Sequence, residues 1–441
     1  MASLAAPAAA AARPGLGGGL TSSRAAPIDL PLRFMLTGLA FAVLAFGAAM
    51  VQAPAFLAGS FLVPPLPLLA HLAALGWLTM VAMGALYQFA PVVLDVPIFS
   101  YRLGRVQFWV YLAGVVGLTG AMASGRMQDA VFGAVLLVAG IGLFLYNMAR
   151  TLARVQHWPL TGWYVVAALT YLGLVVAAGF TLALNIRLGF LPISQRAFIE
   201  AHAHLGALGW LSLLLVGVSY KLTPMFALSH PFDEWRLGKP IFILLNLALP
   251  ALFVSLLLRL GGWALAGCAL VLGAAIALYL RDYALMLHRR RRRRIDLTQW
   301  HNIAAVICLG LTLGLGASLI AAGGSGAFHN RLAMAYAVAA LGGWLGLATI
   351  GQLYKIVPFL VWTQRYAPRM GRERVPLLKD LYPLRPAQAG CGLLCAGLPL
   401  AIGSILAGWL PGIQAGFGLL LAGTLIAAIN LFRVVFDEGF Q

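Results

Sequence analysis

Charged side chains are scarce in this 441-residue chain. Only 10% of its residues are Asp, Glu, Lys or Arg, whereas 62% are hydrophobic, and the mean hydropathy is +0.92. Soluble domains carry about 25% charged and about 45–50% apolar residues. The composition therefore excludes an ordinary soluble protein and indicates that the lipid bilayer is the solvent for most of the chain.

Several cofactor motifs are missing as well. The sequence contains no Walker, Rossmann or CxxCH motif, so it predicts neither a nucleotide cofactor nor a covalently attached haem. Cysteine is rare, and all four thiols fall inside predicted spans, where they behave as small apolar residues: Cys268, Cys308, Cys391 and Cys395. Cys391 and Cys395 share a helix face, but two thiols do not by themselves define a metal site.

Long apolar stretches dominate the rest of the chain. A membrane span needs about 20 mostly apolar residues. Twelve segments meet this rule, near residues 32–54, 66–92, 106–123, 128–150, 160–185, 198–225, 239–258, 262–286, 297–322, 332–360, 388–408 and 411–433. Residues 1–30, rich in Ala, Pro and Gly, are predicted to be a disordered cytoplasmic tail, which leaves 31–435 as a single transmembrane domain.

The basic excess, formally +18, follows this topology. With the N-terminus inside, 25 of the 30 Lys and Arg fall at the inner side, and five fall outside: Arg126, Arg187, Arg196, Arg259 and Arg331. This positive-inside pattern predicts an integral membrane protein, of the bacterial inner membrane, with both termini cytoplasmic. The run from Arg289 to Arg294 is then an inner anchor beside anionic lipid, and no nucleic-acid partner is predicted.

The second, sixth and tenth spans carry the same text. They read HLAALGWLTMVAMGALYQFAP from His71, HLGALGWLSLLLVGVSYKLTP from His204 and VAALGGWLGLATIGQLYKIVP from Val338, at offsets of 133 and 134 residues. Each repeat holds four spans, an even number, so all units keep one orientation. The repeats lie near 31–155, 156–290 and 295–435. The pattern predicts an all-α fold of about twelve transmembrane helices in three parallel four-helix repeats around a pseudo-threefold axis. Packing alone would also explain the shared Gly and aromatic residues.

The histidines separate by depth. Those predicted near the cytoplasmic side are expected in solvated loops or at helix ends: His157, His230, His288 and His301. Nearby residues at inner helix ends are expected to reach out to water: Tyr220, Lys221, Tyr354 and Lys355. Toward the outer side, His71 and His204 lie at the same place in two repeats, and an imidazole at that depth needs a partner.

Neutral imidazole is a good ligand for haem iron or copper, so His71, His204 and His202 are the candidate cofactor ligands. His202 and His204 are separated by about 200° around a helix of 3.6 residues per turn, so they face different neighbours. One could bind a metal while the other forms a hydrogen bond. Hydrogen bonding of all three within a packed core is the alternative.

The segment AHLAALGWLTMVAMGALYQFAPVVLDVPIFSYRLGRVQFWVYLAG, from Ala70, resembles the second helix and following loop of subunit I of the haem-copper oxidases. His71 matches the low-spin haem ligand of that family. The segment AHAHLGALGWLSLLLVGVSYKLTP is similar to small four-helix proteins labelled oxidase subunit I-like. Twelve spans in three units is that family's architecture, so the resemblance covers roughly residues 30–435.

The chain also departs from the family. Family catalysis depends on an HxH pair in helix ten and on copper ligands from helices six and seven. The predicted spans seven and ten contain no histidine, Val338 occupies the repeat position, and His329 falls just before span ten. The family's low-spin haem bridges helices two and ten. We expect here one b-type haem at the pseudo-symmetric place between helices two and six, held by His71 on one face and by His204 or His202 on the other. Copper has no further support, and oxygen reduction is not expected.

The function that follows is electron transfer or binding of a diatomic gas such as NO or O₂, with a respiratory partner or electron donor. Two other classes of function stay open. One is a haem-free transporter or copper-handling protein, in which the histidines line a path. The other is an accessory or assembly subunit of a respiratory complex.

Overall fold

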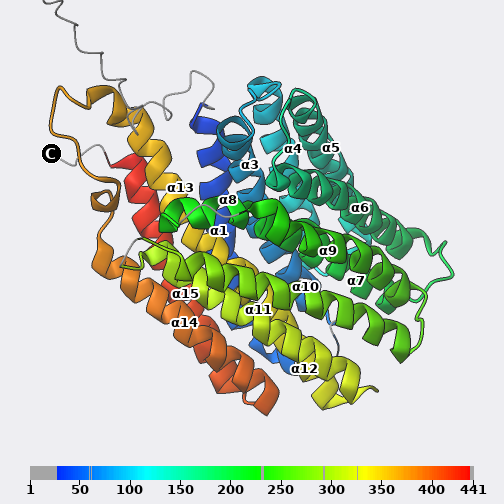
Figure 1. The fold of residues 1–441 in the computed structure, drawn as a ribbon. Coiled ribbons are helices and arrows are strands. Elements are labelled where there is room, and N and C mark those ends of the chain that lie inside the picture. Colours follow the sequence, from blue (N-terminus) through cyan, green and yellow to red (C-terminus); the bar gives the residue numbers. More distant parts are fainter. Residues whose placement is uncertain are drawn as a thin grey trace, which may run out of the picture.

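The computed structural model describes residues 27–437, apart from 59, 61, 230–232, 292, 293 and 325. Regular secondary structure in this part is helical, and twelve segments are long and apolar enough to cross a membrane (Figure 1). The predicted fold class is confirmed, and the chain is an integral membrane protein. Of the predicted cytoplasmic tail, residues 1–26 lie outside the described residues, and so does His230.

Each unit contributes four spans, and the second span of each is built from three successive helical pieces. The first unit holds α1 (Asp29–Val51), then α2 (Pro65–His71), η2 (Leu72–Thr79) and α3 (Met80–Val93), then α4 (Tyr101–Ala123) and α5 (Ala130–Leu152). The second unit holds α6 (Leu160–Leu188), then α7 (Gln195–His204), η4 (Leu205–Ser212) and α8 (Leu213–Ala227), then α9 (Glu234–Leu257) and α10 (Gly262–His288).

The third unit repeats this plan. It holds α11 (Leu297–Ala322), then α12 (Ala327–Val338), η5 (Ala339–Leu347) and α13 (Ala348–Arg365), then α14 (Leu384–Ala407) and α15 (Leu410–Phe436). Side-chain caps begin three of the helices on one side of the bundle: the side chains of Ser100, Asp233 and Asp296 accept backbone N–H groups at the starts of α4, α9 and α11. Such caps accept hydrogen bonds from backbone N–H groups of the first turn, which have no partner within the helix.

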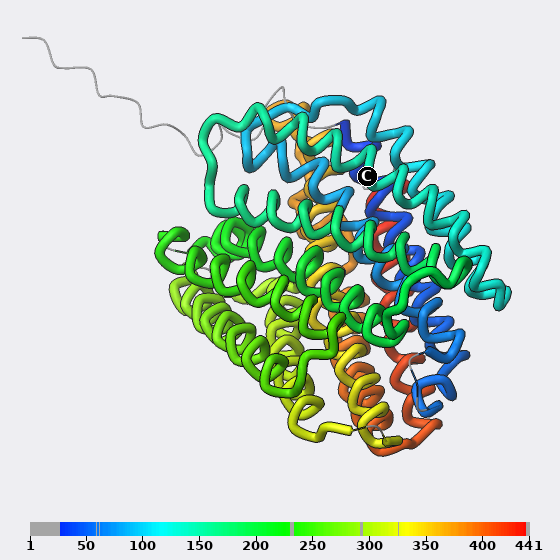
Figure 2. Tube along the Cα trace, turned by 90° about the vertical axis from the view of Figure 1, so that its right-hand side faces the viewer, coloured from blue at the N-terminus to red at the C-terminus, as the bar shows by residue number. Residues whose placement is uncertain are grey.

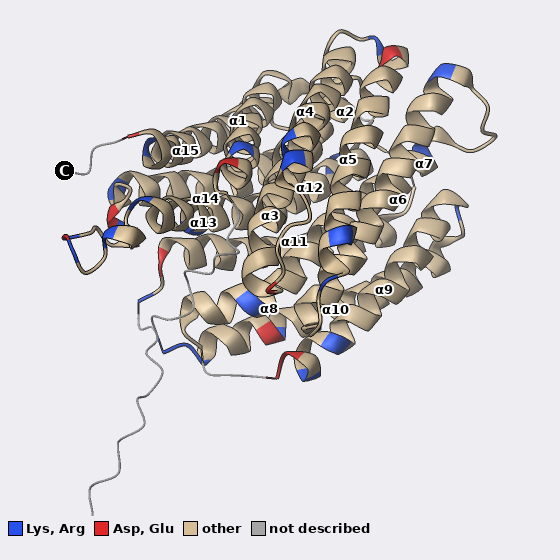
Figure 3. Cartoon of the chain, turned by 90° about the horizontal axis from the view of Figure 1, so that it is seen from above, with Lys and Arg blue, Asp and Glu red and all other residues tan. Residues whose placement is uncertain are grey.

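The units close into a ring. The first helix, α1, packs along the last, α15, and Figure 2 shows the blue and red ends of the chain side by side. At the centre of the ring the segments η2, η4 and η5 contact one another in all three pairings. Charged residues lie mostly toward helix ends and in connections (Figure 3), which leaves the helix middles apolar for lipid and for packing.

The central segments η2, η4 and η5 are π-helical. Each begins directly after the repeat position held by His71, His204 or Val338. A π-helical turn is rare and widens the helix, and it often marks a functional site. The same departure from α-helix in all three units therefore singles out the segments around the pseudo-threefold axis.

Tryptophan side chains join the units at this axis. Trp210 Nε1 of the second unit donates to Thr79 Oγ1 of the first at 3.0 Å, and Trp344 Nε1 of the third donates to Ser212 Oγ of the second at 3.0 Å. These two bonds are equivalent under the pseudo-threefold relation, since the donor and acceptor positions correspond in sequence.

The third interface, between the first unit and the third, lacks this hydrogen bond. The position equivalent to Thr79 and Ser212 is Gly346, and a Cβ there would lie 2.6 Å from Cη2 of Trp77. Trp77 is 1% exposed, and its Nε1 has no hydrogen-bond partner in the described part of the chain. The bulky indole therefore packs on a glycine where the other two interfaces place a hydroxyl.

The three repeat tyrosines are buried, so the expectation that Tyr220 and Tyr354 reach out to water is wrong. Both are 2% exposed. Each repeat tyrosine instead meets a polar residue of the fourth span of its own unit: Asn147 Nδ2 with Tyr87 (3.3 Å), Tyr220 with Asp282 Oδ2 (2.8 Å) and Asn430 Nδ2 with Tyr354 (3.2 Å). A buried hydroxyl needs such a partner, and the fourth span supplies it.

The predicted inner histidines also need one correction. His157 and His288 are exposed, as expected. His301 is 0% exposed, because it lies in α11 against Gly351 and beside the ring of Tyr354. Its Nδ1 donates to the carbonyl of Leu297 at 2.9 Å, a bond inside the helix.

Candidate functional site

A cavity of about 1090 Å³ lies among the second spans of the three units. Ligand pockets commonly have about 300–1,000 Å³, so this cavity has room for a large cofactor. Its lining is mostly apolar, and its polar and aromatic members include His71, His202, His204, His329, Tyr336, Trp77, Trp210 and Trp344. All three sequence-predicted ligands therefore line one cavity.

His71 ends α2 and lines this cavity. Its Nδ1 lies 2.7 Å from the carbonyl oxygen of Pro67. A carbonyl can only accept, so Nδ1 carries the hydrogen and the neutral ring has its lone pair on Nε2. A backbone carbonyl that fixes the tautomer in this way is the usual second partner of a metal-binding histidine.

His202, on α7, lies opposite His71. The two ring centroids are 6.4 Å apart and the ring planes make an angle of 20°. The His202 ring fits against Gly179 of α6, where a Cβ would lie 2.9 Å from Cε1. Its Nδ1 is buried and has no hydrogen-bond partner among the described residues. The pair thus offers a lone pair on His71 and an unsatisfied nitrogen on His202.

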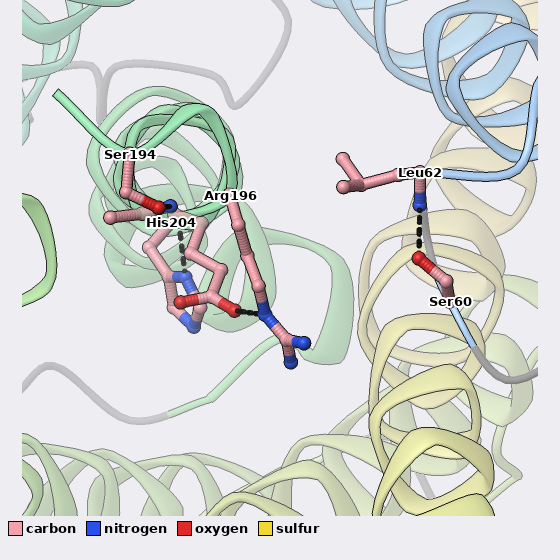
Figure 4. Close-up of polar contacts among 7 residues, drawn as sticks. Ser60, Leu62, Ser194, Arg196 and His204 are labelled. Carbon is pink, nitrogen blue, oxygen red and sulfur yellow. Dashed lines mark hydrogen bonds and ion pairs between the residues drawn. The ribbon is translucent and has the colours of Figure 1, made fainter. Parts of the chain in front are cut away.

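His204 turns to another neighbour, as its spacing from His202 predicts. Its Nδ1 donates to the carbonyl of Glu200 at 2.8 Å. Its Nε2 accepts from the hydroxyl of Tyr336 at 3.2 Å, and the two rings lie 5.8 Å apart at 25°. Figure 4 shows Arg196 and His204 pointing to the same side of α7. Arg196 Nε donates to Glu200 Oε1 at 3.0 Å.

Tyr336 is the site residue that the sequence reading missed. It lies 134 residues after His202, the same offset that relates Val338 to His204. Extending the repeat alignment two residues toward the N-terminus would have shown that Tyr336 occupies the position equivalent to His202. Once the His71–His202 pair is known from the structure, the repeat relates it to two equivalent pairs, His204 with Tyr336 and Val338 with Leu69. The structure brings the first two pairs together, and Val338 and Leu69 both line the cavity.

His329 lies inside the tenth span, so the expectation that this span contains no histidine is wrong. α12 begins at Ala327, five residues before the predicted boundary. His329 lines the cavity, and its buried Nδ1 lacks a hydrogen-bond partner in the described residues. It precedes Val338 by nine residues, which is about 13 Å along a helix. It therefore belongs to the outer rim of the cavity and lies at a different depth from the repeat position.

The donor set fits a haem better than a bare metal ion. Among the residues that the structure describes, no three His, Cys, Asp or Glu side chains group closely enough to hold a metal ion. A haem iron already has four ligands from its macrocycle and needs only axial ones, which imidazoles supply. Two facing imidazoles, a fixed tautomer and a largely apolar cavity meet that requirement.

Comparisons with known proteins support the architecture. No protein-family model and no curated protein matches the sequence. A solved structure described as a heme-copper terminal oxidase dimer is similar in fold, with a TM-score of 0.56 and 13% sequence identity. The match covers 94% of this chain and 85% of that chain. The fold is therefore that of haem-copper oxidase subunit I.

Proposed function

We propose that this chain is a membrane protein of the haem-copper oxidase superfamily that holds one b-type haem between His71 and His202 and serves in electron transfer. The observation that carries this proposal is the facing pair of imidazoles, 6.4 Å apart across a large cavity. A ring nitrogen binds a metal at about 2.0–2.1 Å. The separation leaves room for one ion between the rings.

His202 is a better partner for His71 than His204 is. The Nε2 of His204 already accepts from Tyr336, and its other nitrogen donates to Glu200. Both nitrogens of His204 are therefore satisfied, whereas Nδ1 of His202 forms no hydrogen bond in the described structure, although the His202 ring also interacts with the Val175 backbone. A buried unpartnered nitrogen costs about 1–3 kcal/mol, and metal binding would recover that cost.

Electron transfer is favoured over gas binding because His71 and His202 would both hold the haem iron, which would leave no vacant site there for a gas. When bound, the haem supplies a one-electron Fe(III)/Fe(II) couple. The chain orients the ligands through the Pro67 carbonyl and the Gly179 backbone, and the apolar lining excludes water. A binuclear oxygen-reducing centre is not proposed, since the chain lacks the family's helix-ten HxH pair.

Topology and partners belong to the same proposal. The distribution of Lys and Arg supports a bacterial inner membrane protein with cytoplasmic termini. A one-electron carrier needs an electron donor and an acceptor, so we infer a respiratory-chain partner. The lipid bilayer is the medium of the whole chain.

An absorption spectrum tests the haem. Protein expressed with ample haem is expected to show a Soret band and, when reduced, the bands of a six-coordinate b-type haem. His71→Ala and His202→Ala should each lose most of the haem, while His204→Ala and the rim variant His329→Ala should keep it. Haem loss in His204→Ala together with retention in His202→Ala would overturn the pairing. Wild-type protein without a Soret band would overturn the proposal, and copper without haem would favour metal handling.

A further inference from the structure

A contact between two aromatic side chains recurs in the first two units and is replaced in the third. It joins the first span of a unit to its third span, with the ring centroids 5.0 Å apart and the planes at 81° or 68°: Phe34 with Phe108 in the first unit, and Tyr164 with Phe242 in the second. The third unit has His301 and Cys391 at the equivalent positions. An imidazole and a thiol, which are both metal ligands, thus replace a pair of Phe or Tyr rings.

Glycines of the neighbouring spans fix the register of this comparison. A Cβ at the repeat glycine of each unit would meet the first-span residue: Gly84 with Phe34, Gly217 with Tyr164, and Gly351 with His301. A Cβ at a fourth-span glycine would meet the third span at 2.8 Å in two units: Gly140 with Tyr111 of α4, and Gly423 with Leu394 of α14. Phe108 and Cys391 each lie three residues before these contacts, so they occupy the same place in their units.

Two further cysteines accompany Cys391 in the third unit. Cys308 lies seven residues after His301 on α11, where the first two units have the aromatic residues Phe41 and Tyr171. Its Sγ would lie 2.9 Å from a Cβ on Gly343 of η5. Cys395 lies four residues after Cys391 on α14, at a position held in the other units by Leu112 and Asn246. The third unit has therefore gained three thiols between its first and third spans.

These thiols lie close to one another. The side chains of Cys391 and Cys395 form a hydrogen bond along one face of α14, one helical turn apart. Cys308 of α11 interacts with Cys395 across the contact between the two helices. α11 and α14 begin at the same end of the bundle, and Cys308 and Cys395 each lie about 16 Å from the start of their helix, at 1.5 Å per residue. The result is a bonded thiol pair with a third thiol at the depth of Cys395.

The thiol pair is separate from the haem cavity. Cys391 is 9% exposed and Cys395 is exposed on the outside of α14. Neither residue belongs to the lining of the cavity that holds His71 and His202. A ligand can therefore reach the pair from the side of α14 without entering the cavity.

The chemistry of two thiols selects the ion. Soft sulfur ligands prefer Cu(I), Zn(II) and iron–sulfur clusters. Structural zinc and iron–sulfur clusters require four protein ligands. Within the described part of the chain, no three His, Cys, Asp or Glu side chains group closely enough to hold a metal ion. Cu(I) accepts two sulfur ligands in a line, and a hydrogen-bonded thiol pair supplies that number.

We propose that Cys391 and Cys395 bind one Cu(I) ion between their sulfur atoms. The S–H bond of one thiol breaks, its proton leaves to water, and a Cu–S bond forms at that sulfur. The other thiol binds through a lone pair and keeps its hydrogen. One positive charge enters as one leaves, so the site stays neutral, as burial in an apolar medium requires. Copper remains Cu(I), and no group is oxidised or reduced.

Copper retention in the full-length protein tests the site. Purified protein is loaded with Cu(I) under ascorbate without oxygen and then washed with the Cu(I) chelator bicinchoninate. Wild type is expected to keep close to one equivalent of copper. Cys391→Ser and Cys395→Leu should each lose it several-fold. Cys395→Leu installs the residue of the first unit, so this variant is expected to fold.

The other two cysteines of the chain provide the controls. Cys268→Ser, which removes the thiol of α10, and Cys308→Ser should both keep copper. Equal copper loss in Cys268→Ser and Cys395→Leu would show that any thiol in the chain suffices and would overturn the site. Loss in Cys308→Ser together with retention in Cys391→Ser would overturn the pairing.

A spectroscopic measurement separates this site from the proposed haem, on which it does not depend. X-ray absorption at the copper edge should show two sulfur neighbours, whereas nitrogen neighbours would overturn the proposal. Cys395→Leu should keep the haem content of wild type. Copper lost in His71→Ala but kept in Cys395→Leu would place the ion in the cavity and overturn the thiol site. Copper held by the pair in protein that binds no haem would support the thiol site while the haem proposal fails.

Discussion

The indole of Trp344 donates its Nε1–H to the hydroxyl of Ser212 at 3.0 Å, joining the third unit to the second. The equivalent bond from Trp210 to Thr79 joins the second unit to the first. At the remaining interface, Trp77 faces Gly346, and its Nε1 is buried without a partner within the described structure. The pseudo-threefold ring is thus closed by two hydrogen bonds and one apolar contact.

This asymmetry predicts unequal effects of one substitution. Trp344→Phe removes a hydrogen bond and also leaves the Ser212 hydroxyl without its donor, whereas Trp77→Phe has no hydrogen bond to lose. Interhelical hydrogen bonds in membranes contribute about 0.6–2 kcal/mol. Thermal unfolding in detergent should therefore show a larger loss of stability for Trp344→Phe, by about 1 kcal/mol. Equal losses in the two variants would show that the bond contributes nothing.

Gly179 is predicted to position the His202 ligand. In Gly179→Ala the new methyl group would lie 2.9 Å from the His202 ring, so the ring must move. The haem-to-protein ratio, measured from the Soret band, is expected to fall several-fold. Gly173→Ala on the same helix is the control, since its Cβ would meet only Leu145 at an ordinary 3.5 Å. If both variants keep haem equally, close contact at Gly179 does not set the ligand geometry.

Tyr336→Phe tests the His204–Tyr336 pair separately from the His71–His202 pair. The substitution keeps the ring beside His204 but removes the hydroxyl that donates to Nε2. Haem content should stay at the wild-type value, because Tyr336 does not contact the His71–His202 pair in the described contacts. Unfolding stability should fall by about 0.5–1.5 kcal/mol. A Soret band lost in Tyr336→Phe would instead assign the haem to the His204 side of α7.

Much of the architecture could be predicted from sequence because its causes are local or periodic. Twelve apolar stretches of sufficient length predict twelve spans, and an even number of spans per repeat requires parallel units. His71 and His204 could be selected because an imidazole at that depth is costly without a partner. Even the divergence of His202 and His204 follows from helical geometry alone.

Helix boundaries and the burial of some side chains could not be predicted, because they depend on which neighbouring helices each residue contacts in the fold. Hydropathy placed the start of span ten at residue 332, but the helix extends back to Ala327 and takes His329 into it. Tyr220 and Tyr354 looked like snorkelling residues until their partners on α10 and α15 were known. A helix-end position in sequence does not reveal whether a neighbouring helix covers it.

The sequence by itself determined a bilayer-embedded chain of three related units, because length, apolar composition and repeat offset can be read directly from the amino-acid sequence. Only the tertiary structure decided which histidines face each other. That choice depends on how α2, α7 and α12 are rotated around the pseudo-threefold axis, and the π-helical segments and Trp contacts help to set these rotations. Side-chain packing between distant segments fixes such rotations, and a single sequence does not encode them in any local pattern.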